Sequence, residues 1–335
     1  MTRSKPTQKD VAAAAGVGSA TVQRVLSGRG GVSEEVMERV VRTARKLGYG
    51  RRMPETHHGI FRIEVLMVRP DTEFFSRLNE AFERVAETLD KSIILHRTFI
   101  SDSDPVGAAK RISGPSFRRA GLIVVFPNDP VVVAAVRAAA CQGLPIVQVV
   151  SQTFGPDIPY VGIDNYAAGR TAAYLMTRML RAQAGSIVAI CHSAIYPVHR
   201  DRLRGFSDAL QDHGAAGLFR AILFGRDDER TTAEVLRQAL QDWPDVIGVY
   251  NAGGATTGTA QGLSGKSEVV WVGHELTSIS REYLRAGRMS VVLDQAPEMQ
   301  ARMSVDIVLS RLGLVAGLAE PKPIPFLIVT PENLG

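Results

Sequence analysis

Short apolar runs alternate with longer amphipathic runs over most of this 335-residue chain, beginning near position 62. Apolar runs such as 122–126 and 146–150 are continuous, which is typical of parallel strands covered on both faces. Between them, apolar residues recur at every third or fourth position, which indicates helices. The pattern predicts two successive series of strand, helix and strand, and therefore two doubly wound parallel sheets.

The same pattern places the individual elements of this region. Strands are predicted at 63–68, 93–99, 122–126, 146–150, 160–163, 187–191, 221–224, 246–250, 269–272, 289–293 and 326–329. Helices are predicted at 73–90, 106–112, 130–142, 167–181, 199–213, 231–241, 256–262, 278–286 and 297–312.

The first 49 residues carry no strand-like run and instead predict three short helices. The first is Gln8–Ala15, with Thr7 as its N-cap and Gly16 as a left-handed stop. The second runs to Leu26 and has Ser19 as its cap. Two short helices joined by such a turn form a helix-turn-helix, whose second helix would enter a DNA major groove. The alternative is an ordinary helical cap on a larger domain.

A third helix, 34–47, has Ser33 as its cap and Gly48 as its stop. Apolar residues at helical spacing on the second and third helices predict a small three-helix core. The residues expected there are Val22, Val25, Leu26, Val36, Val40, Ala44 and Leu47.

Charge separates the two regions of the chain. Residues 1–62 contain 12 Lys and Arg against 5 Asp and Glu, whereas the remainder contains 27 against 29, for a net charge of +5 in the whole chain. The basic excess therefore lies with the helix-turn-helix, where it could neutralise DNA phosphates. A solvated basic tail is the alternative reading.

Composition restricts the class of protein further. The length suggests two or three domains at about 150 residues each. The N-terminal stretch has no apolar signal region, and no window reaches the ~18 apolar residues of a membrane span, so we expect a cytoplasmic protein. Cys141 and Cys191 lie in a helical and a strand-like run, and both are expected to be buried and free of disulfides.

The run D-V-A-x-x-A-G-V-x-x-x-T-V-x-R-V-L at 10–26 is followed by V-S-E-E-x-x-E-R-V and L-G-Y. This series resembles the headpiece of LacI/GalR-type repressors. The resemblance implies an operator DNA partner and a homodimer bound to a pseudo-palindrome. It implies that Ser19, Ala20 and Arg24 face base edges, and that Thr7 and Thr21 contact phosphates.

The rest of the chain resembles the sugar-binding periplasmic proteins on which these repressors build their effector domains, most strongly at 160–206 and 269–299. The implied fold is an all-α helix-turn-helix headpiece followed by two doubly wound α/β lobes, with a ligand in the crevice between them. The implied domains are a headpiece at 1–49, a linker at 50–61 and an effector-binding and dimerisation domain at 62–335.

Within that domain, the resemblance implies three crossings between the lobes, near 163–164, 293–294 and 321–325. Lobe 1 would contain about 62–163 and 294–320. Lobe 2 would contain about 164–293 and 324–335. Asp164 with Asn165 matches the family's D-N at a helix start, which we interpret as a structural cap.

A sugar or polyol needs aromatic faces for its C–H surface and polar groups for its hydroxyls. Phe74 and Phe75, in D-T-E-F-F, match the stacking aromatics of pentose-binding relatives, although one of them could instead fill the lobe core. Arg200 opens R-D-R-L-R-G-F and, as the first arginine of R-x-R-x-x-G-F, is expected to point into the cleft. Its neighbours Arg202 and Arg204 are expected to be structural or solvated.

Other ligand candidates lie at strand ends. His274 and Glu275, in V-G-H-E-L-T, stand where relatives place an aromatic and an Asp, although such a carboxylate is often only a helix cap. Gln295 lies at a crossing between the lobes, with Asp294 as the rival. Asn251 ends another strand, where turn chemistry alone would also explain it.

Two segments depart from the family. Ser151-Gln152 replaces the Asp-Arg of pentose binders, which leaves the ligand class open. The linker G-R-R-M-P-E-T-H-H-G lacks the P-N-x-x-A-R-x-L of a hinge helix, and Met53 is its only apolar wedge for the minor groove. Because Pro54 weakens a helix, we predict less DNA kinking, with Arg51 and Arg52 contacting phosphate or the minor groove.

No enzyme site assembles from the sequence. His274-Glu275 does not extend to H-E-x-x-H, and Gly265-Lys266-Ser267 lacks the first glycine of a phosphate loop. No metal and no cofactor are predicted. The sequence thus favours a cytoplasmic, homodimeric transcription regulator, a repressor controlled by a small sugar or polyol. The alternative is a solute-binding protein that has lost DNA regulation.

Overall fold

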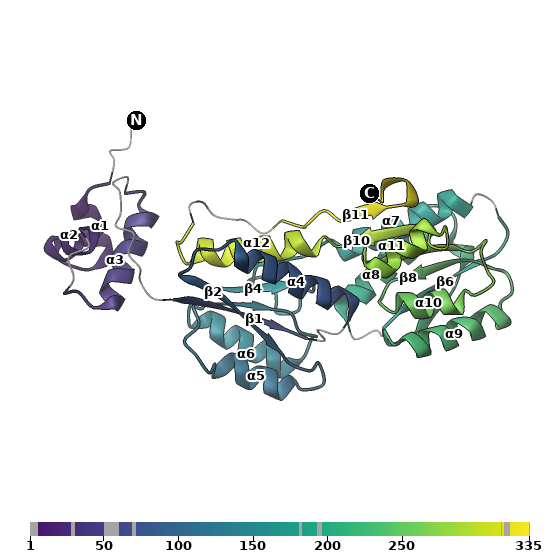
Figure 1. Cartoon of the computed structure of the whole chain (residues 1–335), viewed down its shortest axis with the longest axis horizontal. Helices are drawn as coiled ribbons and strands as arrows, with labels where there is room; N and C mark the ends of the chain where they lie inside the picture. Colours follow the sequence, from purple (N-terminus) through teal and green to yellow (C-terminus); the bar gives the residue numbers. More distant parts are fainter. Residues whose placement is uncertain are drawn as a thin grey trace.

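The chain forms a small helical headpiece and two α/β lobes arranged along one long axis (Figure 1). The computed structural model describes residues 6–27, 31–49, 60–68, 72–180, 183–192, 196–315, 317 and 322–334. The predicted DNA contacts Arg51 and Arg52, and linker residues 50–59 as a whole, lie outside these ranges. Within them, no helix has both the length and the apolar character needed to cross a membrane.

The headpiece contains α1 (Gln8–Ala15), α2 (Ser19–Leu26) and α3 (Glu34–Lys46). Thr7 caps α1 as predicted, in a reciprocal capping box with Asp10. Gly16 ends α1 with a φ of 66°. The predicted cap of α2 is wrong, because Gly18 occupies the N-cap in extended backbone and Ser19 is the first helical residue. No side chain therefore caps α2.

The three helices close the predicted core, with one exception. The buried residues are Val11, Ala12, Ala15, Val22, Val25, Val40, Val41 and Ala44, and Leu26 and Val36 pack partly against them. Leu47 was predicted in this core but is 38% exposed. It follows the last residue of α3, and Tyr49 packs against the core.

Lobe 1 is built on a sheet in the order β2-β1-β3-β4-β5, with parallel neighbours throughout. Its strands are β1 (Phe61–Met67), β2 (Ile93–Phe99), β3 (Gly121–Val124), β4 (Ile146–Val149) and β5 (Tyr160–Val161). The helices that cover its two faces are α4 (Glu73–Glu87) and α12 (Pro297–Arg311) on one side and α5 (Pro105–Ser113) and α6 (Pro130–Cys141) on the other.

Lobe 2 is built on a sheet in the order β11-β10-β9-β8-β6-β7. Its strands are β6 (Ser186–Cys191), β7 (Phe219–Phe224), β8 (Val246–Asn251), β9 (Val270–His274), β10 (Val291–Asp294) and β11 (Leu327–Val329). Its α-helices are α7 (Asn165–Leu180), α8 (Pro197–Asp212), α9 (Glu229–Asp242), α10 (Thr256–Gly262) and α11 (Ser278–Arg285). A purely parallel sheet was predicted, but β11 runs antiparallel to β10.

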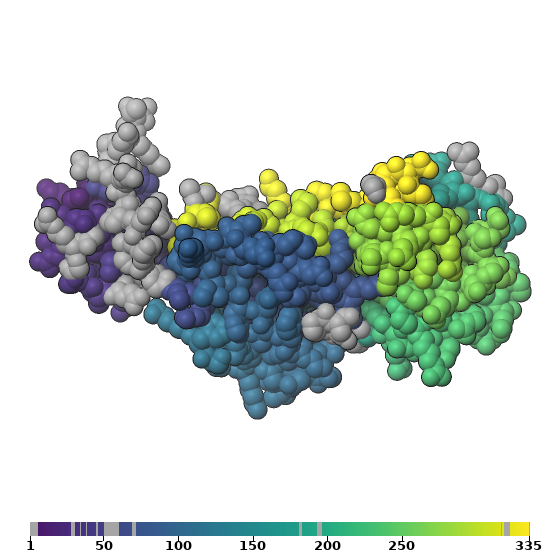
Figure 2. Space-filling model, in the orientation of Figure 1, coloured from purple at the N-terminus to yellow at the C-terminus, as the bar shows by residue number. Residues whose placement is uncertain are grey.

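The chain passes between the sheets where β5 is followed by α7, where β10 is followed by α12, and before β11. Helix α12 consequently belongs to lobe 1, where it packs against α4, β3 and β4 although β10 belongs to the other sheet. Figure 2 shows α12 lying beside α4 along the upper surface of lobe 1. The crossings bring the carboxyl ends of both sets of parallel strands to one junction.

Two further sequence expectations concern single residues. Asp164 accepts a hydrogen bond from the backbone N–H of Ala167 at 2.8 Å, so it caps the start of α7 as expected. Cys191 is buried as expected, but Cys141 is exposed because it is the last residue of α6 and lies off the buried face of that helix.

Helices α7 and α8 pack closely because glycines lie at their contact. A Cβ atom on Gly205 would overlap the carbonyl oxygen of Tyr166, and one on Gly169 would overlap that of Arg202. Since α8 carries side chains of the junction between the lobes, this close approach also determines where those side chains lie.

We therefore predict that Gly205→Ala lowers the free energy of unfolding by about 1–3 kcal/mol, because the added methyl forces the two helices apart. Urea denaturation of the full chain measures the change. Gly217→Ala is the matched control, since a Cβ there meets no heavy atom within 4 Å. Equal stability of both variants would contradict the close packing.

Candidate functional site

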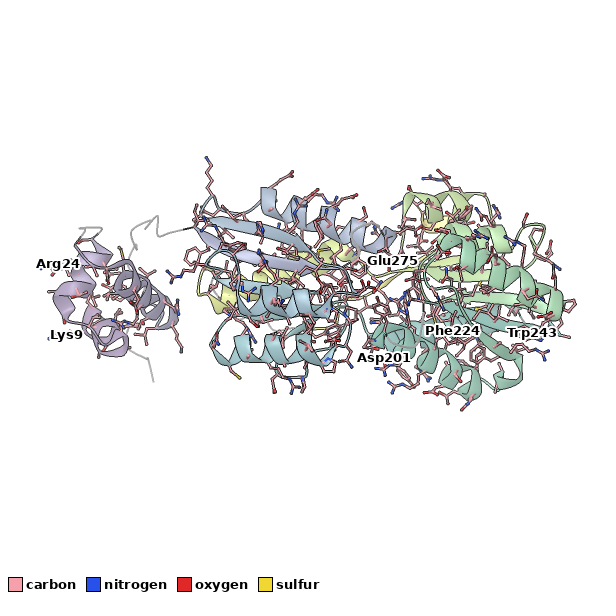
Figure 3. The ribbon with its side chains drawn as sticks, turned by 90° about the horizontal axis from the view of Figure 1, so that it is seen from below. Lys9, Arg24, Asp201, Phe224, Trp243 and Glu275 are labelled. Atoms are coloured by element: carbon pink, nitrogen blue, oxygen red, sulfur yellow. The ribbon has the colours of Figure 1, made fainter. Side chains whose placement is uncertain are left out.

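A cavity of about 440 Å³ lies between the lobes, at the carboxyl ends of the strands. Segments that follow β1, β3, β4, β7, β8, β9 and β10 contribute to its lining, together with the start of α8. Figure 3 shows Glu275, one of the lining residues, at the junction of the two lobes. The volume lies in the range of small-molecule sites.

Unusual backbone conformations gather around this cavity. All the described non-glycine residues with positive φ lie within four residues after strands β4, β7, β8, β9 and β10, and they are Val150, Arg226, Asp227, Ala255, Glu275 and Ala296. Such conformations cost about 1–3 kcal/mol each and are retained mainly at functional sites. The backbone is therefore strained at the place where the cavity is.

The arginine at the cavity is not the one expected from the sequence. Arg202 lines the cavity and is 3% exposed, whereas Arg200 is exposed and lies outside the lining. Residues two apart on a helix project about 200° apart, so only one of the two can face the cleft. Arg202 donates to Asn165 Oδ1 and to the carbonyl of Ala252, both at 2.8 Å. These bonds use two of its five N–H groups.

Both predicted aromatic residues lie at the cavity. Phe74 and Phe75 are in the first turn of α4 and make an edge-to-face contact, with ring centroids 5.3 Å apart. Each is also partly buried against the core that includes residues of both lobes, and Phe75 packs against a second core within lobe 1. They therefore supply the apolar wall of the cavity and pack on the lobe beneath it.

Glu275 and Gln295 lie together in the cavity lining, 5% and 4% exposed. The Gln295 amide donates to Oε1 of Glu275. Arg77 donates to Asp294 at 2.5 Å and reaches Oε2 of Glu275 at 3.5 Å. Burial and the Asp294 carboxylate raise the pKa of Glu275 to about 8. The acceptor carboxylate expected from the sequence is thus protonated near neutral pH, so it can donate as well as accept.

His274 lines the cavity and is 3% exposed. Its Nε2 lies 3.0 Å from the Tyr250 hydroxyl. Burial, reinforced by the Arg202 charge, holds the pKa of His274 well below its usual value. The ring is therefore neutral at pH 7 and offers a polar wall without charge.

Asn251 does not line the cavity, contrary to the sequence expectation. Its side chain donates to the carbonyl of Gly254 at 2.8 Å and to Thr259 Oγ1 at 3.0 Å, and it accepts from the N–H of Gly253 at 3.0 Å. These side-chain bonds hold the turn before α10 and tie it to that helix, which is the turn chemistry given as the alternative explanation. Asn251 acts on the cavity only by shaping Gly253 and Gly254, which line it.

Sequence reasoning missed several lining residues, among them Glu73, Tyr196, His199, Asp227 and Glu229. Glu73 directly precedes the aromatic pair, and Asp227 begins the turn before α9, so each follows a strand of the sheets. A position soon after a predicted strand was the sequence signal that could have identified these two acids. It does not separate acids that cap helices from acids that face a ligand.

The second candidate site is the outer surface of α2. Ser19, Ala20 and Arg24 are exposed and Thr21 is partly exposed, while Val22 and Val25 pack inward. In Figure 3, Arg24 lies with Lys9 on the side of the headpiece turned away from the lobes. Thr7 is exposed at the start of α1, but its hydroxyl is already bonded to Asp10.

Two family models match the chain. The model of the periplasmic binding protein domain matches residues 63–313. The model of bacterial regulatory proteins, lacI family, matches residues 7–51. A comparison with curated protein sequences gives no match.

Solved structures with a similar fold include sugar-binding and other solute-binding proteins. GanP, a glucose-galactose binding protein from Geobacillus stearothermophilus, has a TM-score of 0.70 at 17% identity, over 82% of this chain and 99% of its own. A solute-binding protein from Actinobacillus succinogenes with bound D-allose has a TM-score of 0.72 at 17% identity, over 82% and 99%. One from Burkholderia graminis with D-arabinose has a TM-score of 0.72 at 16% identity, over 82% and 97%.

The protonated Glu275 predicts a pH-dependent stability. Because its pKa is raised on folding from an ordinary value of 4.5 to about 8, the folded chain holds this proton where the unfolded chain releases it. The contribution of Glu275 to the free energy of unfolding therefore falls as pH rises from about 5 to 8, by up to about 1.4 kcal/mol per pH unit. Urea denaturation at pH 6 and pH 8 measures it.

Glu275→Gln cannot ionise and should flatten this slope, whereas Glu298→Gln, a change at a half-exposed carboxylate, should keep it. An unchanged slope in Glu275→Gln would show that Glu275 is already ionised at neutral pH.

Proposed function

The chain belongs to the periplasmic binding protein domain family and carries a lacI-family regulatory headpiece, and from this premise we propose that it regulates transcription from operator DNA. We propose a cytoplasmic repressor whose DNA affinity is controlled by a small sugar or polyol bound between the lobes. The observation that carries this proposal is the strained, polar cavity between the lobes of a chain that also has a helix-turn-helix.

The headpiece supports the DNA part of the proposal. Its second helix exposes Ser19, Ala20 and Arg24 on one side, and the first 62 residues carry the basic excess of the chain. In the proposed complex Arg24 reads a base edge, Thr7 and Thr21 lie near phosphates, and Arg51 and Arg52 contact the backbone or the minor groove.

The cavity supports the effector part. Phe74 and Phe75 offer an apolar wall, and Arg202, Glu275 and Gln295 offer donors and acceptors in a buried setting. A compound with one C–H face and several hydroxyls satisfies both sets. Some solute-binding proteins of this fold hold D-allose or D-arabinose, which supports the same class.

Exposed apolar side chains on the edge strands of both lobes support a homodimer made through the lobes. Ile94 and Phe99 on β2 are 40% and 43% exposed, and Ile222 and Phe224 on β7 are 40% and 49% exposed. Apolar surface of this kind at a sheet edge favours association. A dimer would present two headpieces to the half-sites of a pseudo-palindrome, and closure of the lobes around a ligand would change their spacing.

The effector proposal predicts a thermal response to sugars. A thermal-shift assay on the full chain should first test D-allose, D-arabinose and D-tagatose, because each is bound in a solved structure of similar fold. At 100 times the dissociation constant, a bound sugar stabilises by about 2.7 kcal/mol. Arg202→Lys should reduce the shift, and Arg200→Ala should leave it unchanged. If Arg200→Ala reduces the shift and Arg202→Lys does not, then Arg200 rather than Arg202 contacts the ligand.

The DNA proposal predicts separate effects on affinity and on specificity. Operator affinity of the full chain should fall steeply with salt. Arg24→Ala should cost about 1–3 kcal/mol of discrimination between operator and mutated operator. Arg237→Ala, which removes an exposed charge from α9 in lobe 2, is the control. Full operator preference in Arg24→Ala would rule out base reading by Arg24, and no DNA binding by the intact chain would favour a solute-binding protein without DNA regulation.

A further inference from the structure

Two side-chain hydrogen bonds join the lobes beside the cavity. The Tyr196 hydroxyl, at the start of α8 in lobe 2, donates to Asp102 Oδ2 at 2.6 Å, and Asp102 follows β2 in lobe 1. The Thr256 hydroxyl, in the first residue of α10 in lobe 2, donates to Glu73 Oε2 at 3.0 Å, and Glu73 begins α4 in lobe 1. We call these two bonds the latch.

The Tyr196–Asp102 bond lies away from the crossings between the lobes, whereas Glu73 lies one turn of α4 before Arg77, which contacts Asp294 at a crossing. In lobe 1 the chain leaves from β5, and β2 and β1, which precede Asp102 and Glu73, lie at the opposite end of that sheet. In lobe 2 the crossing strands β10 and β11 form one end of the sheet, whereas β6, which precedes Tyr196, lies toward the other. By this topology, the crossings form the hinge, the Tyr196–Asp102 bond closes the opposite side, and the Thr256–Glu73 bond joins the lobes between them.

The Tyr196 side chain is held in place on its own lobe. The Tyr196 ring contacts the rings of His192 and His199, with centroids 4.9 Å and 5.7 Å apart. Thr256 is 3% exposed and follows Ala255, whose φ of 55° sets the start of α10. The ring contacts of Tyr196 within lobe 2 lower the conformational entropy that is lost when its bond to Asp102 forms.

We propose that Asp102 and Thr256 are positioning residues that hold the lobes closed over a bound effector through Tyr196 and Glu73. This inference rests on the proposed function. Tyr196 and Glu73 line the cavity, but Asp102 and Thr256 are not part of the described lining. They act on ligand retention by keeping the exit shut, without touching the ligand.

The two bonds set the size of the effect. A ligand enclosed between the lobes leaves only after they separate, which breaks both bonds. A net hydrogen bond is worth about 1 kcal/mol, so each bond lost should speed ligand dissociation about fivefold. Entry from the open state does not require the latch, so association rates should change little.

The test uses the full chain with Asp102→Ala, Thr256→Val and the two combined. The matched control is Tyr166→Phe, which removes a tyrosine–aspartate bond of 2.9 Å to Asp208 that lies within lobe 2. Small-angle scattering without added sugar reads the separation of the lobes. Stopped-flow fluorescence reads the dissociation rates of D-allose, D-arabinose and D-tagatose.

The double variant should have a larger radius of gyration than the wild type, and any sugar that binds should dissociate from it about 25-fold faster, given about 1 kcal/mol per bond. Thr256→Ser keeps the hydroxyl, so it should keep the lobes closed where Thr256→Val opens them. The control should resemble the wild type in both measurements. An unchanged radius of gyration in the double variant, or an equal change in Tyr166→Phe, would overturn the latch. If the wild type binds none of the three sugars, the proposed effector class fails, while the scattering result still decides the latch.

Discussion

The ion pair between Arg77 and Asp294 is the contact on which the junction of the lobes depends. Arg77 belongs to α4 in lobe 1, and Asp294 ends β10 in lobe 2. The same carboxylate accepts from the N–H groups of Leu276, in the segment after β9, and Ala296, at the crossing after β10, so it joins these two segments. A buried carboxylate with an arginine and backbone donors is well satisfied, and removing one partner would leave an unpaired buried charge. The segments that carry Glu275 and Gln295 therefore have one defined position.

This arrangement explains why the cavity combines strain with unusual ionisation. The Asp294 carboxylate opposes a second negative charge nearby, so it raises the pKa of Glu275 together with burial. Glu275 and Ala296 take left-handed backbone conformations, and Glu275 and Gln295, the neighbour of Ala296, line the cavity. Such conformations persist only where the surroundings over-determine them, as the two sheets and the ion pair do here. The free energy that these strained conformations cost is offset by burial of a continuous core that includes residues of both lobes.

The headpiece is chemically simple beside this junction. The exposed side of α2 begins with Gly18, Ser19 and Ala20, which offer few groups to base edges, so Arg24 is its main candidate reader. With so few direct contacts, discrimination among operators would rest on Arg24 and on the shape and deformability of the DNA. The two lobes would then act on transcription by setting the distance between two such headpieces. A change at the latch or the hinge would in this way alter DNA binding.

The sequence by itself determined the element types, the two-sheet architecture and part of the headpiece core, because periodicity and capping are local: Thr7, Gly16 and Asp164 act on their own neighbours in the chain. It also located the strand ends at which Phe74, His274, Glu275 and Gln295 line the cavity. Only the tertiary structure decided that Arg202 rather than Arg200 lines the cavity. It also decided that the Asn251 side chain bonds to its own turn, and that β11 runs antiparallel to β10. The same holds for the pairing of Asp102 with Tyr196, 94 residues apart. These features depend on helix rotation and on contacts between distant segments, for which a single sequence carries no local signal.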